Sequence, residues 1–367
     1  MEANGDNALK KRVKTRQIMV RNVPIGGGAP ISLQSMTKTD TRNAAETIRQ
    51  ILELKAAGCD IVRVAIPDEA ALTSFKRIRQ EVDVPLVADI HFNASLAIKA
   101  IEAGADCIRI NPGNIGGEAK VREVVSAAKD RNIPIRIGVN SGSVEKELME
   151  RFGGPTPEAM VESALRHVNI LEKLGFYEMK ISVKASSVID TILAYRLLSS
   201  KVDYPLHLGV TEAGTSFRGA IKSALGIGIL LSEGIGDTIR VSLTADPKEE
   251  VIAGNEILAS LGLRERRGIE LISCPTCGRL EIDLPSLVSR LEKRLAHINV
   301  PLKVSVLGCV VNGPGEAAEA DIGIAGGKGV GIIIKGGKVV KKCSETELED
   351  ELIKEIEEMV QKRTSHN

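Results

Sequence analysis

The sequence has few aromatic residues, no tryptophan and almost no net charge. Of its 367 residues only 2% are aromatic, and the formal net charge is +1. The scarcity of aromatic rings argues against a protein that stacks on single-stranded nucleic acid. The near-zero charge provides no electrostatic footprint for nucleic acid or a membrane surface. We therefore expect neither as a partner.

Long apolar runs are also missing. No stretch approaches transmembrane length, and the basic first thirty residues contain no continuous apolar segment, so we expect no membrane span and no signal peptide. The chain has only six cysteines, which suits a reducing compartment better than a disulfide scaffold. The sequence therefore predicts a cytoplasmic globular protein.

From residue 31 to about 260, short β-branched runs alternate with amphipathic stretches. We expect strands at residues 31–36, 61–66, 85–90, 107–111, 134–139, 179–184, 205–210 and 238–243, with helices between them, as at 118–130 and 157–174. Strict alternation favours a parallel sheet, and eight units favour closure into a (β/α)8 TIM barrel. An open doubly wound sheet is the alternative, but no strand is followed by its Gly-x-Gly-x-x-Gly turn. A hairpin with a glycine-rich turn is expected at 16–28, covering the bottom of the barrel.

The alternating pattern ends at a charged, glycine-bounded linker, residues 262–268. Beyond it we expect strands at 269–273, 302–307 and within 321–340, and helices at 284–296 and 345–362. This order predicts a small α+β domain. The expected domains are therefore a substrate-binding barrel at 1–262 and an α+β domain at 263–367.

Five of the expected barrel strands repeat an apolar–cation–apolar pattern. The cations are Arg63, Arg109, Arg136, Lys180 and Arg240. Because strand side chains alternate between faces, aliphatic neighbours that pack outward leave each cation pointing into the barrel. Unpaired buried charge costs several kcal/mol, and arginine suits phosphate oxygens. The pattern therefore predicts a phosphate or diphosphate substrate.

Polar residues cluster just past the expected strand ends, where barrel enzymes place their chemistry. The set is Asp89, His91, Asn111, Asn114, Asn140, Ser182, Lys184, His207, Thr211 and Ser242. Any one could be a helix N-cap, but together they predict a polar substrate pocket. Glu212, beside a glycine and near several cations, is the better acid–base candidate, whereas His207 is equally suited to orienting a neighbour.

A ligand-like cysteine pattern lies in the second expected domain. Cys274 and Cys277 enclose two residues, and Cys309 and Glu316 follow. Three thiolates leave a fourth position for an oxygen ligand or for substrate. A zinc ribbon would have a second Cys-x-x-Cys, a redox dithiol would not need Cys309, and a radical-adenosylmethionine barrel would carry its cysteines near the first strand. A cubane cluster whose fourth iron binds Glu316 or substrate fits what is present.

Several motifs resemble those of the 4-hydroxy-3-methylbut-2-enyl diphosphate synthase (IspG, GcpE) family. They are Cys274-Pro-Thr-Cys277-Gly-Arg279, Gly308-Cys309-Val-Val-Asn-Gly-Pro-Gly-Glu316, Leu33-Gln-Ser-Met-Thr37, Ala88-Asp-Ile-His-Phe92, Arg109-Ile-Asn-Pro-Gly-Asn114 and Val210-Thr-Glu-Ala-Gly214. The resemblance covers essentially the whole chain. There is no room for the extra domain of the plant form, so the chain is similar to the short bacterial type.

This resemblance implies reductive ring opening of 2-C-methyl-D-erythritol 2,4-cyclodiphosphate to (E)-4-hydroxy-3-methylbut-2-enyl diphosphate, a step of the non-mevalonate (MEP) isoprenoid pathway. It implies a 4Fe-4S cluster held by Cys274, Cys277, Cys309 and Glu316, and a diphosphate held by the barrel cations. It also implies flavodoxin or ferredoxin as electron donor, and a homodimer in which one subunit's cluster domain caps its partner's barrel. Our hypothesis is that Glu316 is a removable ligand and that Glu212 handles the proton.

Two other interpretations remain open from the residues. A pterin-type synthase has a similar phosphate-binding barrel but needs no cysteine triad. A cluster-based redox sensor would leave the cation ring unexplained. Iron and sulfide analysis after anaerobic purification distinguishes both from the reductive enzyme.

Overall fold

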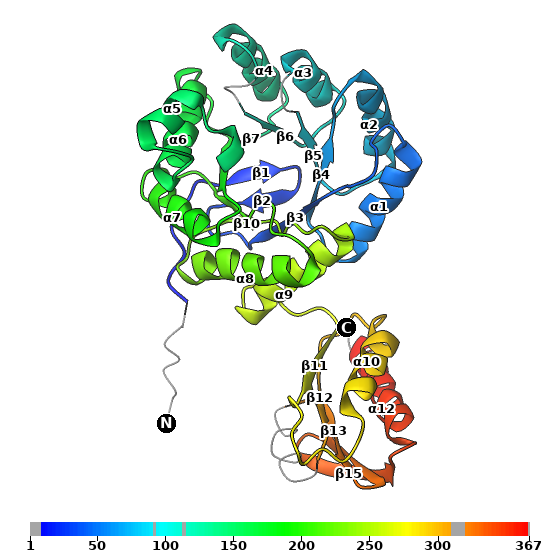
Figure 1. Cartoon of the computed structure of the whole chain (residues 1–367). Helices are drawn as coiled ribbons and strands as arrows, with labels where there is room; N and C mark the ends of the chain where they lie inside the picture. The colour runs from blue at the N-terminus through cyan, green and yellow to red at the C-terminus, as the bar shows by residue number, and fades with distance from the viewer. Residues whose placement is uncertain (1–8, 91–92, 112–114, 310–319, 366–367) are drawn as a thin grey trace. The chain divides into compact units, whose positions relative to one another are not determined.

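The computed structural model describes residues 9–90, 93–111, 115–309 and 320–365 (Figure 1). The chain divides into two compact units, Met1–Arg264 and Glu265–Asn367. Each unit has its own hydrophobic core.

Eight parallel strands form the first unit. They are β3 (Ser32–Met36), β4 (Ile61–Ala65), β5 (Leu86–Asp89), β6 (Cys107–Ile110), β7 (Ile135–Asn140), β8 (Met179–Lys184), β9 (His207–Leu208) and β10 (Thr238–Ile239). The strand order is β8-β7-β6-β5-β4-β3-β10-β9, and a parallel bridge between Ile181 and Leu206 joins the two ends. The predicted (β/α)8 barrel is confirmed.

Helices surround this sheet (Figure 1). They are α1 (Ala44–Ala56), α2 (Glu69–Glu81), α3 (Ala94–Glu102), α4 (Glu118–Asp130), α5 (Lys146–Phe152), α6 (Pro157–Lys173), α7 (Val188–Ser199), α8 (Ser216–Ser232) and α9 (Pro247–Ser260). Helix α2 illustrates the local design: the Asp68 carboxylate caps its start by accepting from the Ala71 amide, and Leu72, Phe75 and Ile78 are buried. The outward-facing aliphatic side chains of the strands complete this core.

The last two barrel strands are shorter than predicted. The parallel ladder ends at Leu208 in β9 and at Ile239 in β10, although we expected strands to 210 and 243. Beyond the ladder the backbones of the two segments pass very close, since a Cβ on Gly209 would lie 2.5 Å from the carbonyl oxygen of Arg240. The absence of a side chain at Gly209 permits this approach.

A hairpin closes the bottom of the barrel, as predicted, but its turn is not glycine-rich. Strands β1 (Ile18–Val20) and β2 (Val23–Ile25) are joined through Arg21, whose φ is +56°, while the glycines at 26–28 follow the hairpin. Two-residue hairpin turns need positive φ, which Arg21 adopts here in place of glycine. The buried hairpin side chains pack on Ile61, Val87 and Cys107 at the amino ends of three barrel strands.

The second unit is a two-layer α+β domain, as predicted. Its sheet has the order β11 (Ile269–Ser273), β12 (Leu302–Leu307), β13 (Ile322–Gly327), β14 (Val330–Lys335) and β15 (Lys338–Ser344), with the first three strands parallel and the others antiparallel. Helices α10 (Leu284–Leu295) and α12 (Leu348–Thr364) share a hydrophobic core with the sheet.

Candidate functional site

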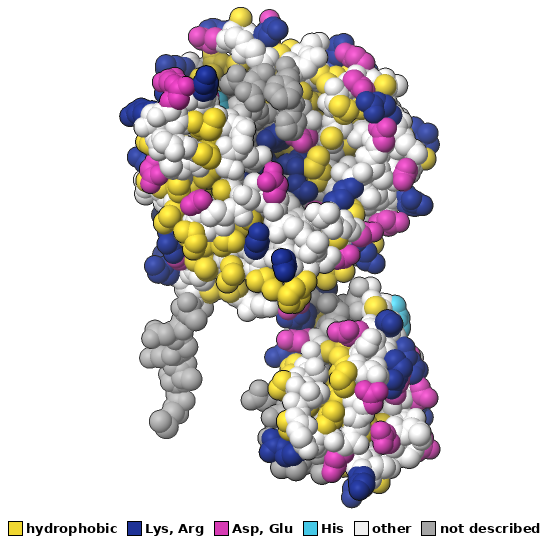
Figure 2. Space-filling model, viewed as in Figure 1, with side chains coloured by type: hydrophobic (Ala, Val, Ile, Leu, Met, Phe, Trp, Pro, Cys, Tyr) yellow, Lys and Arg dark blue, Asp and Glu magenta, His cyan; other side chains and the backbone are white. Residues whose placement is uncertain are grey.

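The barrel interior is lined by cations. Alternation along β4 to β8 places aliphatic residues such as Val62 and Ile108 in the outer core, so Arg63, Arg109, Arg136 and Lys180 project inward. Figure 2 shows a hollow in the barrel in which Lys and Arg side chains gather. Strand register brings three of these residues into one row, because Arg109 pairs with Arg136 and Arg136 pairs with Lys180.

A buried carboxylate stands among these cations. Asp89, at the end of β5, lies 3.3 Å from Arg109 Nη1 and 3.8 Å from Arg63 Nε. Asp89 is 5% exposed, so these ion pairs form in a low-dielectric interior. There, removing either partner would leave an uncompensated buried charge. Asp89 is therefore a counter-ion that orients two arginines, and direct contact with substrate stays a prediction.

Two further residues place the arginine side chains. The Arg136 guanidinium donates through Nη2 to Ser182 Oγ at 3.0 Å. The Arg109 guanidinium lies against Gly138 of β7, where a Cβ would be 2.7 Å from Arg109 Nε. Gly138 is thus the inward position at which a missing side chain makes room for an arginine.

Burial lowers the pKa values of several cations of this cluster, and repulsion from neighbouring cations adds to the shift. Burial, with repulsion from Arg109, lowers the pKa of Arg136 to about 10. Burial also lowers the pKa of Lys180 to about 8. The pKa of Lys184 falls well below its usual range because of burial and of four neighbouring arginines. An anion in this hollow would relieve these costs.

His207 is held in its neutral form. Burial, followed by repulsion from Arg136 and Lys184, lowers the pKa of His207 well below its ordinary value. Its Nδ1 lies 3.4 Å from Thr238 Oγ1. A neutral imidazole in this position can accept or donate a hydrogen bond but supplies no proton near neutral pH.

The remaining predicted pocket residues occupy the carboxyl ends of the strands. Asn111 follows β6 and is buried, Asn140 and Lys184 end β7 and β8, and Thr211 and Ser242 are half-buried beyond β9 and β10. His91 and Asn114 lie outside the described residues. The described residues of this group therefore lie at the carboxyl ends of the strands, whereas Ser182 lies within β8 and His207 begins β9.

Glu212 is exposed and strained. It follows Thr211, whose amide donates to the Ala185 carbonyl, and its φ is +51°. A non-glycine residue in this left-handed region costs free energy that the surrounding fold must supply. The strain accompanies a carboxylate on the loop that follows β9, at the cation-bearing end of the barrel.

Sequence reasoning missed three residues at this site. Glu250 of α9 is a buried carboxylate that pairs with Arg240, and Lys38, beyond β3, lies 3.0 Å from it. Both amide atoms of Gln34 are buried without a hydrogen-bond partner in the described ranges. In the sequence, only the motif at 33–37 pointed to Gln34 as a site residue. Nothing pointed to Glu250, which has the position of an ordinary acid in the first turn of a helix.

The three predicted cysteine ligands lie in loops that leave neighbouring strands. Cys274 follows β11 and Cys309 follows β12 after Gly308, and the two strands pair in parallel, so both loops leave the same edge of the sheet. Cys277 is exposed, and Arg279, through its backbone amide and side chain, lowers the pKa of the Cys277 thiol. Among the described residues no group of three metal-ligating side chains is assembled, and Glu316 lies outside them.

The donor set nevertheless fits an iron–sulfur cluster. The Glu281 amide donates to the Gly308 carbonyl, which links the loop after β11 to the loop after β12. A Cβ on Gly308 would lie 2.2 Å from Leu280 Cδ1, so the Leu280 side chain packs directly against the Gly308 backbone. Thiolates on two linked loops at one sheet edge are the soft ligands that such clusters use.

The other cysteines have no comparable setting. Cys59 and Cys107 are buried in the barrel, and burial raises the pKa of the Cys59 thiol to about 12. Cys343 is half-buried on β15 against the core of the second unit. Buried thiols of raised pKa are inert packing residues.

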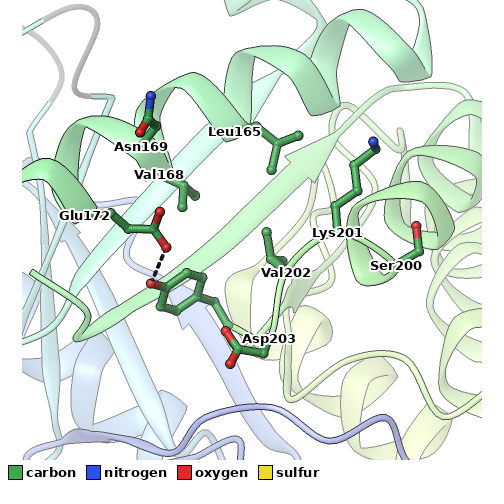
Figure 3. A pocket seen from close by; sticks show the side chains of 9 residues that line it. Leu165, Val168, Asn169, Glu172, Ser200, Lys201, Val202 and Asp203 are labelled. Atoms are coloured by element: carbon green, nitrogen blue, oxygen red, sulfur yellow. Dashed lines mark hydrogen bonds between the residues drawn. The ribbon is translucent and has the colours of Figure 1, made fainter.

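A separate hollow of about 460 Å³ lies on the outside of the barrel, between α6 and the segment after α7 (Figure 3). Tyr204 closes one side by donating to Glu172 at 2.7 Å. None of the predicted site residues lines this hollow.

Within the described ranges, no helix is long and apolar enough to cross a membrane.

Two family descriptions match the chain in order. Residues 15–255 match "GcpE TIM-barrel domain", and residues 270–358 match "GcpE protein C-terminal domain". The 4-hydroxy-3-methylbut-2-en-1-yl diphosphate synthase (flavodoxin) of Caldanaerobacter subterraneus subsp. tengcongensis is 61% identical over 96% of this chain and 99% of its own length. The protein of the same name from Geobacter sulfurreducens is 58% identical over 95% of this chain and 99% of its own length.

Solved structures share the barrel at low identity. Dihydropteroate synthase of Stenotrophomonas maltophilia has a TM-score of 0.50 and 13% identity, and it covers 67% of this chain and 98% of its own. N-acetylneuraminic acid synthetase of Leptospira borgpetersenii has a TM-score of 0.50 and 14% identity, and it covers 77% of this chain and 98% of its own. These likenesses concern the fold alone. The two family matches and the full-length relatives show that this chain belongs to the GcpE family.

Proposed function

We propose that this protein catalyses the reductive ring opening of 2-C-methyl-D-erythritol 2,4-cyclodiphosphate to (E)-4-hydroxy-3-methylbut-2-enyl diphosphate. The observation that carries this proposal is the set of buried cations in the barrel, of which the described carboxylates Asp89 and Glu250 pair with only a part. The names of the relatives supply the reaction. A small cyclic diphosphate is the polyanion that such a hollow would bind.

The barrel residues have separate tasks in this proposal. The cations and strand-end polar residues bind and orient the diphosphate; they are Arg63, Asp89, His91, Arg109, Asn111, Asn114, Arg136, Asn140, Lys180, Ser182, Lys184, His207, Thr211, Arg240 and Ser242. Neutral His207 serves as a hydrogen-bonding group because its low pKa removes it as an acid. Glu212 holds the proton that the reaction consumes. Replacing Glu212 by glutamine should lower kcat by about 10²–10⁴-fold with the diphosphate still bound, the usual effect of losing a general acid.

The second domain, 263–367, would carry a 4Fe-4S cluster. Cys274, Cys277, Cys309 and Glu316 would hold it, and the bound cluster would supply single electrons and one substrate-accessible iron. Flavodoxin, which the relatives' names include, or ferredoxin would deliver the electrons. Replacing Glu316 by alanine should leave a cluster with altered spectroscopy at its unique iron. An unchanged spectrum would remove Glu316 from the ligand set.

We extend the proposal to a homodimer in which the cluster domain of one subunit caps the barrel of its partner. A continuous apolar surface over α7 and α8 supports self-association (Figure 2). Its most exposed members are Ile189, Leu193, Phe217, Ile221 and Leu225. Exposed apolar patches of this kind mark interaction sites, and the stripe 217, 221, 225 follows one face of α8. A cytoplasmic location suits the six free cysteines.

Two experiments test the proposal. Protein purified without oxygen should contain iron and sulfide and should convert the cyclic diphosphate when supplied with reduced flavodoxin; an active protein free of iron would refute the cluster assignment. Mixing an Arg136→Met variant with a Cys309→Ser variant should restore part of the activity, because one mixed dimer then holds an intact barrel and an intact partner cluster. No recovery after verified subunit exchange would exclude the capped dimer.

A further inference from the structure

A buried carboxylate outside the predicted set controls one arginine of the barrel. We infer that Glu250 is a positioning residue for the anion site: it fixes Arg240 so that one edge of the guanidinium stays available for a phosphate oxygen. The inference rests on the proposed diphosphate substrate and adds a residue that neither the strand pattern nor the family motifs indicate.

Glu250 is held on all sides by groups from separate segments. The Leu243 amide donates to Oε1 at 3.1 Å, and Ser35 Oγ donates to Oε2 at 3.1 Å. Lys38 Nζ lies 3.0 Å from Oε1, and Arg240 Nη2 lies 3.5 Å from Oε2. Glu250 is 1% exposed, so this carboxylate has one fixed orientation.

The Arg240 side chain is only half committed to this pair. Its Nη2 faces Glu250, whereas its Nε is buried without a hydrogen-bond partner among the described residues. A guanidinium is planar, so fixing one end fixes the direction in which the remaining N–H groups point. The side chain is 13% exposed and therefore reachable from the hollow.

The ladder does not place Arg240 by itself. Strand β10 ends at Ile239, and beyond it the Arg240 amide donates to the Leu208 carbonyl at 3.0 Å. A long side chain beyond the last paired residue would lose rotamer freedom when it binds an anion. The Glu250 carboxylate removes that freedom before the ligand arrives.

A second part of the barrel, from β4 to β6, uses the same arrangement. Asp89 pairs with Arg63 and Arg109 there, as Glu250 pairs with Arg240 and Lys38 here. In both places a buried acid joins cations that come from two different segments. A carboxylate that only balanced charge would weaken an anion site, whereas one that orients a guanidinium lowers the entropy lost on binding.

The test compares Glu250→Gln with a matched control, Asp237→Asn. Asp237 is also a buried acid, 2% exposed, and pairs with Arg12, but it precedes β10 at the other end of the barrel. Binding of inorganic pyrophosphate to the full chain is measured by calorimetry, and thermal unfolding is measured alongside. We expect Glu250→Gln to weaken binding about tenfold, the effect of one charge-assisted hydrogen bond. Asp237→Asn should change binding less than about twofold while losing comparable stability.

Steady-state kinetics separate positioning from general damage. Glu250→Gln should raise KM for the cyclic diphosphate with kcat nearly unchanged, since an interaction made equally in ground and transition states affects KM. The double variant Glu250→Gln with Arg240→Gln should bind pyrophosphate no more weakly than Arg240→Gln alone, because Glu250 acts through Arg240. If Glu250→Gln fails to fold, Ser35→Ala decides, since it removes one bond to Glu250 and should weaken binding about two- to threefold.

Three results would overturn the inference. Additive effects in the double variant, equal losses for Asp237→Asn and Glu250→Gln, or unchanged binding in Ser35→Ala and Glu250→Gln would each do so. In all three, wild-type binding of pyrophosphate would leave the proposed substrate class standing. A wild-type chain that binds no pyrophosphate would instead refute the proposed barrel function, and this inference with it.

Discussion

The barrel and the second unit prepare their candidate sites in opposite ways. In the barrel, the charged side chains stand on paired strands or, for Arg240, directly beyond one; they are mostly buried and are already oriented by Asp89, Ser182 and Glu250. In the second unit, the cysteines stand on loops beyond the strands, and Cys277 is exposed. An anion site needs dipoles and charges fixed in advance, because reorganisation costs binding energy. A metal centre can impose order on its ligands when it binds.

The sharpest way to separate the two units is to remove one thiolate. Cys277→Ser or Cys309→Ser should abolish iron binding and reduce turnover by at least about 10³-fold, because a missing ligand removes the redox centre. Pyrophosphate binding by calorimetry should stay as in wild type.

Cys343→Ser is the control for this prediction. Cys343 is half-buried on β15 and lies outside the predicted ligand set, so this variant should keep its iron and its activity. A loss of pyrophosphate binding in Cys277→Ser would contradict the separation of the two sites.

Replacing a barrel cation should weaken pyrophosphate binding and at the same time raise the free energy of unfolding. Lys180 is fully buried, and its Nζ has no hydrogen-bond partner within the described residues. Lys180→Met should therefore raise the free energy of unfolding by about 1–3 kcal/mol. Pyrophosphate affinity should fall. Chemical denaturation and calorimetry measure the two effects, with exposed Lys201→Met as the control. A destabilised Lys180→Met variant would show that Lys180 has a structural role.

The same lysine predicts a pH dependence. Burial lowers the pKa of Lys180 to about 8, from a usual value of 10.5. Between these values the unfolded chain binds a proton that the folded chain does not, so the free energy of unfolding should rise with pH in this window. Denaturation curves at pH 8, 9 and 10 should show a smaller rise for Lys180→Met than for wild type. Equal slopes would exclude Lys180 as the source.

The smallest predicted effect concerns the space for Arg109. A methyl group at Gly138 would meet the Arg109 guanidinium, so Gly138→Ala should destabilise the barrel by about 1–2 kcal/mol and weaken pyrophosphate binding a few-fold. Gly228→Ala is the control, because a Cβ on Gly228 of α8 meets no atom within 4 Å. Equal binding by both variants would mean that Arg109 can move aside at no cost.

The inward cations could be predicted because the signal is local. An apolar–cation–apolar triplet on a buried strand fixes the direction of its central residue without knowledge of distant partners. Glu250 could not be predicted in this way. An acid in the first turn of a helix usually complements the helix dipole, and only the folded chain shows that Glu250 faces Arg240 from the next element.

The extent of the elements was less predictable than their order. The sequence at 205–210 and 238–243 has strand character throughout, yet pairing stops where the backbones at Gly209 and Arg240 converge. The three glycines at 26–28 predicted the hairpin turn, but Arg21, whose φ is positive, lies in that turn instead. At Gly209 a tertiary contact outweighed a local strand preference.

The β1–β2 hairpin has a kinetic consequence. Because Ile18, Val20 and Ile25 fill the amino end of the barrel with buried side chains, the interior has a closed floor. Substrate and product must then pass through the same opening, and each occupies it to the exclusion of the other. Inhibition by the linear diphosphate product should therefore be competitive with the cyclic substrate, and its inhibition constant should reflect the same cations.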